Sequence, residues 1–431
     1  MTQDHSNPSS FDGLGVDPKL LAILDNKKFS KPTPIQHQCI PHAIQGKDVV
    51  GIAQTGTGKT LAFGIPLIQR LAKLKGQALI LVPTRELALQ VQESLMNIGQ
   101  PIGLKTEVVI GGASAHMQIK GLRKNPHVVI ATPGRLIDHL REGKYKLNLV
   151  HTVILDEADR MFDIGFLPDI KRILKLAPTK RQTLLFSATM PTAIAQIASQ
   201  FMKMPLRIEV SPAGTSAKNV EQELFIVDKQ EKVRLLERVL KDNKGSVLVF
   251  SRTKHGAKKI NTLVQAMGHS ASEIHSNKSL AQRKEAMSGF KSGKYRVLVA
   301  TDIAARGIDV TGIALVINYD MPENNEDYVH RIGRTGRAGA GGKAISFAMP
   351  DQRGNIKQIE RLIKKTIPIL ASPKLEPESD SVMRALYMGG GSSSRRAGGN
   401  HRGRSSTGGG ARSARRSRSR RPGFRRARAS R

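Results

Sequence analysis

Short apolar runs recur along the chain, and longer amphipathic stretches separate them. In the first half these runs are "KDVVGIA" (47–53), "QALILV" (77–82), "TEVVI" (106–110), "HVVIA" (127–131), "HTVILD" (151–156) and "QTLLF" (182–186). They are rich in valine and isoleucine and apolar on both faces, which is typical of strands in a parallel sheet covered by helices. Residues 61–74 and 85–98 have the apolar spacing of amphipathic helices. The pattern therefore predicts an α/β fold.

One stretch interrupts this alternation. The sequence "VSPAGTSAKN" (210–219) is small and polar, with proline and glycine, and predicts a linker. Strand-like runs then resume at 246–250, 295–300, 314–318 and 343–348. We therefore predict two α/β domains, at 1–209 and 220–370, followed by an extension at 371–431.

Positive charge is distributed unevenly along the 431 residues. The net charge is +34, and 14 of these charges are arginines between Gly389 and Arg431, so the first 388 residues keep +20. This last segment consists largely of arginine, glycine and serine and cannot form a core, so we predict that it is disordered. An excess of positive charge in both parts favours a polyanionic partner, most simply nucleic acid. A solubilising tail without a target is the alternative.

Several classes of protein are excluded by what the sequence lacks. The single cysteine, Cys39, rules out a disulfide framework or a cysteine-based zinc site within one chain, and we expect it to be a small buried residue. The polar N-terminal residues do not resemble a signal peptide, and no apolar run approaches membrane-spanning length. We therefore expect a soluble cytoplasmic protein with no membrane partner.

The sequence "AQTGTGKT" (53–60) lies between a predicted strand and a predicted helix. In this context it fits a phosphate-binding loop, in which backbone N–H groups at a helix N-terminus surround phosphate oxygens. Gly56 and Gly58 would allow the backbone to approach the phosphates closely. Lys59 would reach the β- and γ-phosphates, and the Thr60 hydroxyl would bind Mg²⁺. The alternative is a glycine-rich turn that ends in a surface lysine.

The stretch "VILDEADRMF" (153–162) passes from apolar residues directly into three carboxylates. Asp156 follows a predicted strand, and open α/β sheets bind ligands at the carboxyl ends of their strands. A phosphate-binding loop needs an acidic partner there, so we expect Asp156 to hold Mg²⁺, partly through water. Glu157 is placed to take the proton of the attacking water. Taken alone the stretch could be a solvated acidic helix start, but with the loop it predicts hydrolysis of a nucleoside triphosphate.

These two motifs and five others resemble, in the same order, those of the DEAD-box RNA helicases. The resemblance covers about residues 11–365. Stretches such as "GRLIDHL", "ADRMFDIGF" and "IHSNKS" are most similar to the bacterial RhlE group. It implies two tandem RecA-like domains and an ATP-dependent RNA helicase, with ATP and Mg²⁺ as cofactors. The motifs are "AQTGTGKT" (53–60), "PTRELA" (83–88), "TPGR" (132–135), "DEAD" (156–159), "SAT" (187–189), "ATDIAARGID" (300–309) and "HRIGRTGR" (330–337).

The resemblance also implies how adenine is recognised. "FSKPTPIQ" (29–36) matches the family's adenine-recognition motif, in which Gln36 would present a donor and an acceptor to the adenine edge. Phe11 resembles the aromatic residue that stacks on the base, although a core anchor is an equal alternative. Lys28 stands where the family has a glycine. The expected ATP-binding residues are Phe11, Gln36, Ala53 (where the first loop glycine is expected), Gln54, Thr55, Gly56, Thr57, Gly58, Lys59, Thr60 and Asp309, the last as a ribose contact.

Other motifs are expected to link ATP to the second domain. Ser187 and Thr189 of "SAT" resemble hydroxyls that connect the carboxylate motif to domain closure, with Asp159 as their partner. His330 is expected in the same interdomain network. Arg334 and Arg337 are implied as arginine fingers, because the guanidinium fork suits the charge spread over phosphoryl oxygens. The expected catalytic set is Lys59, Asp156, Glu157, Arg334 and Arg337.

The remaining motifs imply contacts with RNA. They mix backbone amides, hydroxyls and arginines, which suits sugar and phosphate, so we expect largely sequence-independent binding. The family's "QxxR" reads "LAQR" (280–283) here, so Leu280 replaces a glutamine beside Arg283, and Gln282 could compensate. The expected contacts are Pro83, Thr84, Arg85, Gly111, Gly112, Thr132, Pro133, Gly134, Arg135, Arg252, Arg283 and Thr301.

The implied mechanism is local strand separation without long-range translocation. ATP and RNA would each contact both sides of a cleft only when it is closed, so both favour closure and are coupled. The arginine-rich tail is expected to act as an auxiliary RNA tether, and ribosomal or RNA-decay partners are possible. Two other functions stay open: a DNA-directed helicase or translocase, and an ATP-dependent RNA clamp or annealing protein.

Overall fold

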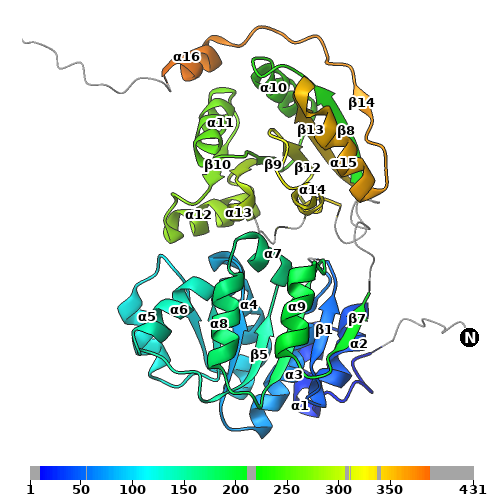
Figure 1. The fold of residues 1–431 in the computed structure, drawn as a ribbon. Helices are drawn as coiled ribbons and strands as arrows, with labels where there is room; N and C mark the ends of the chain where they lie inside the picture. Colours follow the sequence, from blue (N-terminus) through cyan, green and yellow to red (C-terminus); the bar gives the residue numbers. More distant parts are fainter. Residues whose placement is uncertain are drawn as a thin grey trace, which may run out of the picture. The chain divides into compact units, whose positions relative to one another are not determined.

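The chain forms two seven-stranded sheets, and every strand pair within them is parallel. The structure is a computed structural model that describes residues 10–54, 56–210, 220–305, 310, 312–336 and 341–388. Helices cover both faces of each sheet (Figure 1). The predicted α/β class, with parallel sheets covered by helices, is confirmed.

The first sheet has the strand order β3-β4-β2-β5-β6-β1-β7. Most of these strands are the apolar runs of the sequence, buried along their whole length. The last edge strand differs, because three of its four residues are exposed. The strands are β1 (Val49–Ile52), β2 (Gln77–Leu81), β3 (Thr106–Val109), β4 (Val128–Ala131), β5 (Val150–Leu155), β6 (Gln182–Ser187) and β7 (Leu206–Glu209).

The second sheet has the order β10-β11-β9-β12-β13-β8-β14, which repeats the first order with each strand seven numbers later. Strand n of the first sheet therefore has a counterpart n + 7 at the same position in the second. The strands are β8 (Val220–Ile226), β9 (Val247–Phe250), β10 (Ala271–Ile274), β11 (Val297–Ala300), β12 (Leu315–Asn318), β13 (Gly342–Ala348) and β14 (Ile369–Leu370).

Helices follow the strands, as the sequence pattern predicts for crossover connections. Those around the first sheet are α1 (Pro18–Asn26), α2 (Pro34–Ile44), α3 (Lys59–Lys73), α4 (Arg85–Gly99), α5 (Ala115–Leu122), α6 (Pro133–Arg141), α7 (Ala158–Asp163), α8 (Leu167–Leu176) and α9 (Thr192–Phe201). Those around the second are α10 (Lys232–Asp242), α11 (Lys254–Ala266), α12 (Leu280–Lys291), α13 (Asp302–Ala305), α14 (Asn325–Ile332), α15 (Arg353–Ile363) and α16 (Asp380–Met388).

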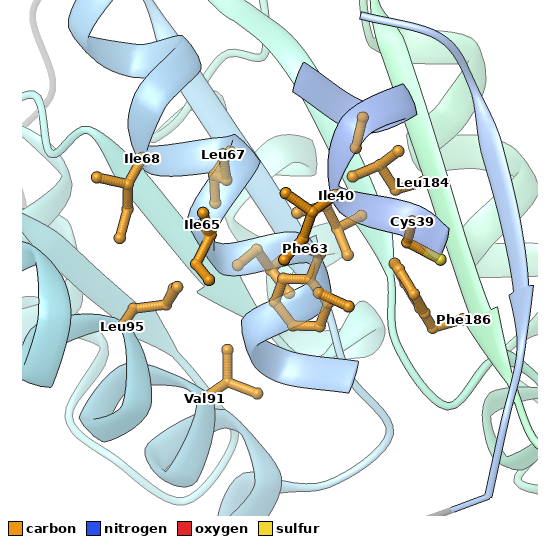
Figure 2. Packing of buried hydrophobic residues seen from close by; sticks show 14 of the residues in the cluster. Cys39, Ile40, Phe63, Ile65, Leu67, Ile68, Val91, Leu95, Leu184 and Phe186 are labelled. Atoms are coloured by element: carbon orange, nitrogen blue, oxygen red, sulfur yellow. The ribbon is translucent and has the colours of Figure 1, made fainter. Parts of the chain in front are cut away.

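Alternate residues of the strands face two separate cores. In β1, Val49 packs with α1–α4 on one face, and Val50 packs with α6–α9 on the other. Figure 2 shows the first of these cores, where Phe63 of α3 lies close to Phe186 of β6, with ring centroids 5.5 Å apart. Cys39 of α2 is fully buried in the same core, and burial raises the pKa of its thiol to about 12. It is thus a packing residue, as the sequence predicts.

Helix α16, beyond residue 370, packs against two helices of the second domain. Val382 of α16 is fully buried against Val233 of α10 and Leu263 of α11, and the Ser381 hydroxyl donates to the Ala266 carbonyl at 3.0 Å. The tail that follows, predicted to be disordered from about Gly389, lies outside the described residues. Across the helices that are described, none combines the length and the apolar character that a bilayer crossing requires.

Candidate active site

The parallel sheet brings three predicted motifs to one edge of the first domain. The carboxyl ends of β1 and β6 are neighbours, and the Ala53 N–H donates to the Ser187 carbonyl at 2.9 Å. Strand β5 pairs with β6, so Asp156 at its end joins the same edge. The phosphate-binding loop, the carboxylate motif and "SAT" therefore meet where open α/β sheets bind ligands.

The glycine-rich loop has the backbone geometry that phosphate binding requires. Gly56 and Gly58 have φ values of 88° and 89°, in the left-handed region where a side chain would be strained. The loop is held by a hydrogen bond from the Thr57 hydroxyl to the Gln54 carbonyl at 2.7 Å. Helix α3 begins directly after it, at Lys59, so its first N–H groups face the position where phosphate would bind.

Gln36 connects the adenine-recognition motif to this loop. Its side-chain Oε1 accepts from the Thr33 N–H at 2.9 Å, and its Nε2 donates to the Gly58 carbonyl at 3.0 Å. Because a primary amide has two donor hydrogens and two acceptor lone pairs, one of each is left for a base edge. A Cβ on Gly58 would clash with this amide, so glycine is required there for a second reason.

Lys59 and Asp156 lie together as a buried pair of opposite charges. Lys59 is 6% exposed, and its ammonium donates to the Ala53 carbonyl at 2.9 Å, across the loop. Burial raises the pKa of the Asp156 carboxyl to about 7, although the Lys59 ammonium opposes this rise, and the Glu157 carboxylate adds to it. Asp156 is therefore an anion that its protein surroundings do not fully compensate, which favours a cation beside it.

Glu157 is held by an arginine that the sequence analysis did not single out. The Arg160 Nη1 lies 2.9 Å from the Glu157 Oε2, and the two side chains are 2% and 4% exposed. This buried ion pair fixes the direction of the carboxylate. Glu157 also has a left-handed backbone (φ 53°), which for a non-glycine residue costs about 1–2 kcal/mol and is concentrated at functional sites.

Asp159 is joined to both hydroxyl residues of "SAT". Its Oδ2 accepts from the Thr189 N–H at 2.9 Å and the Thr189 hydroxyl at 3.1 Å, and its own N–H donates to the Ser187 hydroxyl at 3.1 Å. Burial alone would raise the pKa of the Asp159 carboxyl, but the Lys59 and Arg160 charges and the Thr189 N–H lower it. Asp159 is thus saturated by protein donors and is poorly suited to bind a metal ion.

The oxygen atoms near the loop suit Mg²⁺. Asp156 contributes a carboxylate, and Thr60, half-buried in the first turn of α3, contributes a hydroxyl. In the part of the chain that is described, no three His, Cys, Asp or Glu residues cluster to hold a metal ion by themselves. Mg²⁺ commonly takes one or two carboxylates, with water and substrate phosphates as further ligands.

Two residues upstream of the loop have clear surroundings. Phe11 is 3% exposed within the core that contains α1–α4, as expected for a core anchor, and its stacking on a base stays a prediction. Lys28 is exposed and has φ 61°, directly after α1. The family's glycine at this position would adopt that conformation without strain, so the departure has a local energetic cost.

The predicted RNA residues of the first domain also gather at one edge, beyond β2, β3 and β4. The Arg85 side chain lies against Gly111 and Gly112, where a Cβ on Gly112 would clash with its guanidinium. Arg135 Nη2 donates to the Ala113 carbonyl at 3.0 Å, which fixes the same glycine loop. Thr84 and Thr132 are the N-cap residues of α4 and α6, with Pro83 before the first and Pro133 and Gly134 opening the second.

A glutamine that the motifs do not include organises this cluster. Gln118 of α5 accepts from the Arg135 Nε at 3.2 Å, lies 3.0 Å from the His139 Nε2, and donates to the Ile110 carbonyl at 2.7 Å. No sequence signal distinguished Gln118, because glutamine is ordinary on an amphipathic helix. Arg160 had a weak signal, since it is a cation placed directly after a run of carboxylates.

The predicted residues of the second domain lie on its loops and helix ends. Arg252 follows β9, Thr301 follows β11, and Arg283 lies in α12 with its Nη1 3.4 Å from the His275 carbonyl. Gln282 forms the capping box of α12 with Ser279. One side-chain hydrogen bond of Gln282 is therefore used to cap this helix. The Arg334 Nε donates to the His330 carbonyl at 3.2 Å, at the C-terminus of α14.

Three predicted site residues cannot be placed. Thr55 of the phosphate-binding loop, Asp309 as a ribose contact and Arg337 as the second arginine finger lie outside the described residues. The delivery of Arg334 to the γ-phosphate of ATP requires both domains together and stays a prediction.

The fold and this edge define a class of protein: tandem RecA-like domains of which the first carries a phosphate-binding loop with an acidic partner. Comparison with known families gives the particular group. Residues 33–197 match the DEAD/DEAH box helicase family, and residues 231–339 match the helicase conserved C-terminal domain. The DEAD-box ATP-dependent RNA helicase CshA of Geobacillus kaustophilus is 42% identical over 379 residues, which are 87% of this chain and 81% of that protein.

A second relative, the DEAD-box ATP-dependent RNA helicase CshA of Bacillus subtilis, is 41% identical over 370 residues, which are 85% of this chain and 75% of that protein. The chain therefore belongs to the DEAD-box helicases and is an ATP-dependent RNA helicase. Among solved structures, S. cerevisiae Dbp5 bound to RNA and ADP BeF3 matches with a TM-score of 0.77 and 29% identity over 85% of this chain and 96% of that one. Mss116p bound to ssRNA and AMP-PNP matches with a TM-score of 0.80 and 27% identity over 90% of this chain and 84% of that one.

Proposed function

We propose that the first domain binds ATP through the residues that converge on the phosphate-binding loop. The free donor and acceptor of the Gln36 amide read the adenine edge, and the N–H groups at the start of α3 take the phosphates. Lys59 exchanges its hydrogen bond with the Ala53 carbonyl for the β- and γ-phosphates. Thr60 and Asp156 hold Mg²⁺, which when bound offsets the negative charge of the phosphates.

Glu157 then accepts a proton from the attacking water at its side-chain carboxylate. Its buried ion pair with Arg160 supports this role, because the pair holds the carboxylate in one orientation beside Asp156. Arg334, together with Arg337, supplies charge to the γ-phosphate when the domains close. Asp159, Ser187 and Thr189 transmit the state of the nucleotide to that closure, and His330 takes part from the second domain.

RNA is bound by sugar and phosphate contacts along both domains. The close packing of Arg85, the Gly111–Gly112 loop and Arg135 supports this, because two half-buried arginines beside a glycine loop suit a phosphate backbone. Arg252, Arg283 and Thr301 continue the path on the second domain. Closure around ATP bends one strand so that it cannot stay paired, and hydrolysis reopens the cleft.

We further propose that the protein is cytoplasmic, belongs to the RhlE group, and uses its arginine-rich tail as an auxiliary RNA tether. The sequences of the motifs support the grouping. The 14 arginines of residues 389–431, a segment that contains no acidic residue, support the tether. Ribosomal or RNA-decay partners would be consistent with such an activity.

The single observation that carries the proposed mechanism is the convergence of Lys59, Asp156 and Glu157 at the end of the glycine-rich loop. The test is RNA-stimulated ATP hydrolysis by Lys59→Ala and Glu157→Gln, with nucleotide binding measured in parallel. We expect both variants to lose turnover by about 100-fold or more, and only Glu157→Gln to keep its ATP affinity. Turnover near the wild-type rate in either variant would overturn the assignment.

A further inference from the structure

The second domain carries a lysine and an aspartate close to the positions that correspond to Lys59 and Asp156 in the first domain, with Asp320 one residue further from its strand than Asp156. Lys59 is the first residue of α3, which follows β1, and Lys232 is the first residue of α10, which follows the counterpart strand β8. Asp156 follows β5, and Asp320 lies just beyond its counterpart β12. The Asp156 N–H donates to the last carbonyl of β2 at 3.0 Å, and the Asp320 N–H donates to the last carbonyl of β9 at 3.3 Å.

The surroundings of the two lysines differ. Residues 227–231, which connect β8 to α10, contain no glycine, so this loop cannot form the phosphate cradle of residues 53–58. Lys232 is 4% exposed, and its ammonium donates to the Tyr319 carbonyl at 2.8 Å and to Asp320 Oδ1 at 3.4 Å. Burial lowers the pKa of Lys232, and the Asp320 carboxylate opposes that shift. The ammonium is thus committed to the protein.

The other oxygen of Asp320 holds the loop that carries Arg252. Its Oδ2 accepts from the Arg252 N–H at 3.1 Å and from the Ser251 hydroxyl at 3.2 Å. The Arg252 side chain itself is exposed, and Thr253 caps the helix that follows. The backbone of this loop is therefore held by one half-buried carboxylate, while the Arg252 guanidinium is open to a ligand.

Asp320 is also fixed from the side of α14. The Arg331 Nη1 donates to the Asp320 carbonyl at 2.6 Å, and the same guanidinium forms a double ion pair with Asp302 at 2.5 and 2.7 Å. Lys232 and Arg331 thus hold the carboxylate and the backbone of one residue from two directions. Because Asp320 is held at both its carboxylate and its backbone, it has little freedom to move. It therefore determines the position of the Ser251–Arg252 loop that it binds.

We propose that Lys232 and Asp320 are positioning residues for RNA binding. In the first domain the corresponding lysine and aspartate bind the nucleotide. In the second domain the pair holds the Ser251–Arg252 loop in place, so that Arg252 can contact an RNA phosphate. This inference rests on the RNA contact of Arg252 in the proposed function. The pair acts through Arg252 and touches neither nucleotide nor RNA.

A purely structural ion pair is the competing explanation, and a double-mutant cycle separates the two. The affinity for a short single-stranded RNA is measured by fluorescence anisotropy, with a non-hydrolysable ATP analogue present, for Asp320→Asn, Arg252→Ala and the double variant. An asparagine keeps only one acceptor oxygen for three donors, so we expect Asp320→Asn to weaken RNA binding by about tenfold. In the Arg252→Ala background the same substitution should weaken it by less than about twofold, because the residue that it positions is gone.

Asp242→Asn is the matched control. Asp242 forms a 2.7 Å ion pair with Arg238 on the surface of the same helix α10, so this variant removes an equal charge and an ion pair away from the loop. We expect it to leave RNA affinity unchanged. If Asp320→Asn does not fold, Lys232→Gln takes its place. The double-mutant cycle is then measured with Lys232→Gln and Arg252→Ala.

The outcomes separate this inference from the proposed function. Equal losses of affinity with and without Arg252 would show that the pair only stabilises the domain, and would overturn the inference while the RNA path stands. An Arg252→Ala variant with wild-type affinity would remove Arg252 from the RNA path, and the inference with it.

Discussion

The two RecA-like domains share one strand order but carry opposite chemistry at the same edge of the sheet. In the first domain the loop after β1 is rich in glycine, and Asp156, Glu157 and Asp159 follow β5. In the second, the loop after β8 has no glycine, and the helix α14 after β12 carries Arg331 in its last turn, with Arg334 close behind. The first edge thus carries a glycine-rich loop and carboxylates, and the second carries two buried arginines, of which Arg331 is paired with Asp302.

This difference teaches that the scaffold and the chemistry are specified separately. Strand order follows from two-sided apolar runs joined by helices, which both halves of the chain contain. The chemistry depends on a few residues in the loops at the carboxyl ends of the strands. Because the proposed hydrolytic set is divided between the domains, turnover should require both.

The largest effect should come from the second domain's contribution to hydrolysis. Arg334→Lys keeps a positive charge but loses the planar fork, so we expect RNA-stimulated turnover to fall by about 100-fold or more while ATP binding persists. Arg361→Lys, exposed on α15, is the matched control and should retain wild-type turnover. If Arg334→Lys turned over ATP normally, the first domain would be sufficient for hydrolysis and the division between the domains would be wrong.

A second prediction concerns the buried ion pair between Glu157 and Arg160 in the carboxylate motif of the first domain. Arg160→Met leaves Glu157 as an unpaired buried charge, which should cost about 3–5 kcal/mol of unfolding free energy. The measurement is urea unfolding, with Arg172→Met on the surface of α8 as the control. Adding Glu157→Gln to Arg160→Met should restore part of the stability. A loss below about 1 kcal/mol in Arg160→Met would mean that the pair is not energetically buried.

The tail provides a third, smaller test, because it adds positive charge outside both domains. Replacing its 14 arginines with serine, at unchanged length, should weaken RNA binding by about tenfold at low salt and flatten its salt dependence. Removing residues 389–431 should have the same effect, since length alone contributes no charge. Unchanged affinity at low salt in both variants would end the tether hypothesis.

The smallest expected effect is on stability, at one exposed lysine in each domain. Lys28 follows α1 with φ 61°, and Lys364 follows α15 with φ 54°. Glycine adopts this conformation without strain, so Lys28→Gly and Lys364→Gly should each stabilise the protein by about 0.5–1 kcal/mol, net of the added chain entropy. Lys27→Gly, where φ is −90°, should destabilise it. Thermal unfolding checks the direction, and destabilisation by both glycines would contradict the backbone argument.

The sequence predicted the strands that are buried on both faces and the edge strand β3, and it missed β7, β8, β10 and β14. β7 has a single buried residue, β14 spans two exposed residues, and β10 includes the buried Glu273, so none of them reads as an apolar run. β8 alternates buried and exposed positions beside the predicted linker. Edge strands need only one covered face, which leaves a short and weak hydrophobic signal.

The site was predictable where a motif carries the chemistry and unpredictable where a neighbour supports it. Asp156 and Lys59 follow from spacing, because a phosphate-binding loop needs an acidic partner. Arg160, Gln118 and Asp320 hold other residues through contacts that only the folded chain creates. A buried arginine, a helix glutamine and a loop aspartate look ordinary in a sequence.

The most direct test of the central claim is the ATP turnover of the intact protein with and without single-stranded RNA, at saturating ATP and Mg²⁺. If each domain contributes part of the proposed hydrolytic set and RNA favours their closure, RNA should raise the turnover number by about tenfold or more. Equal turnover in the presence and absence of RNA would contradict the account.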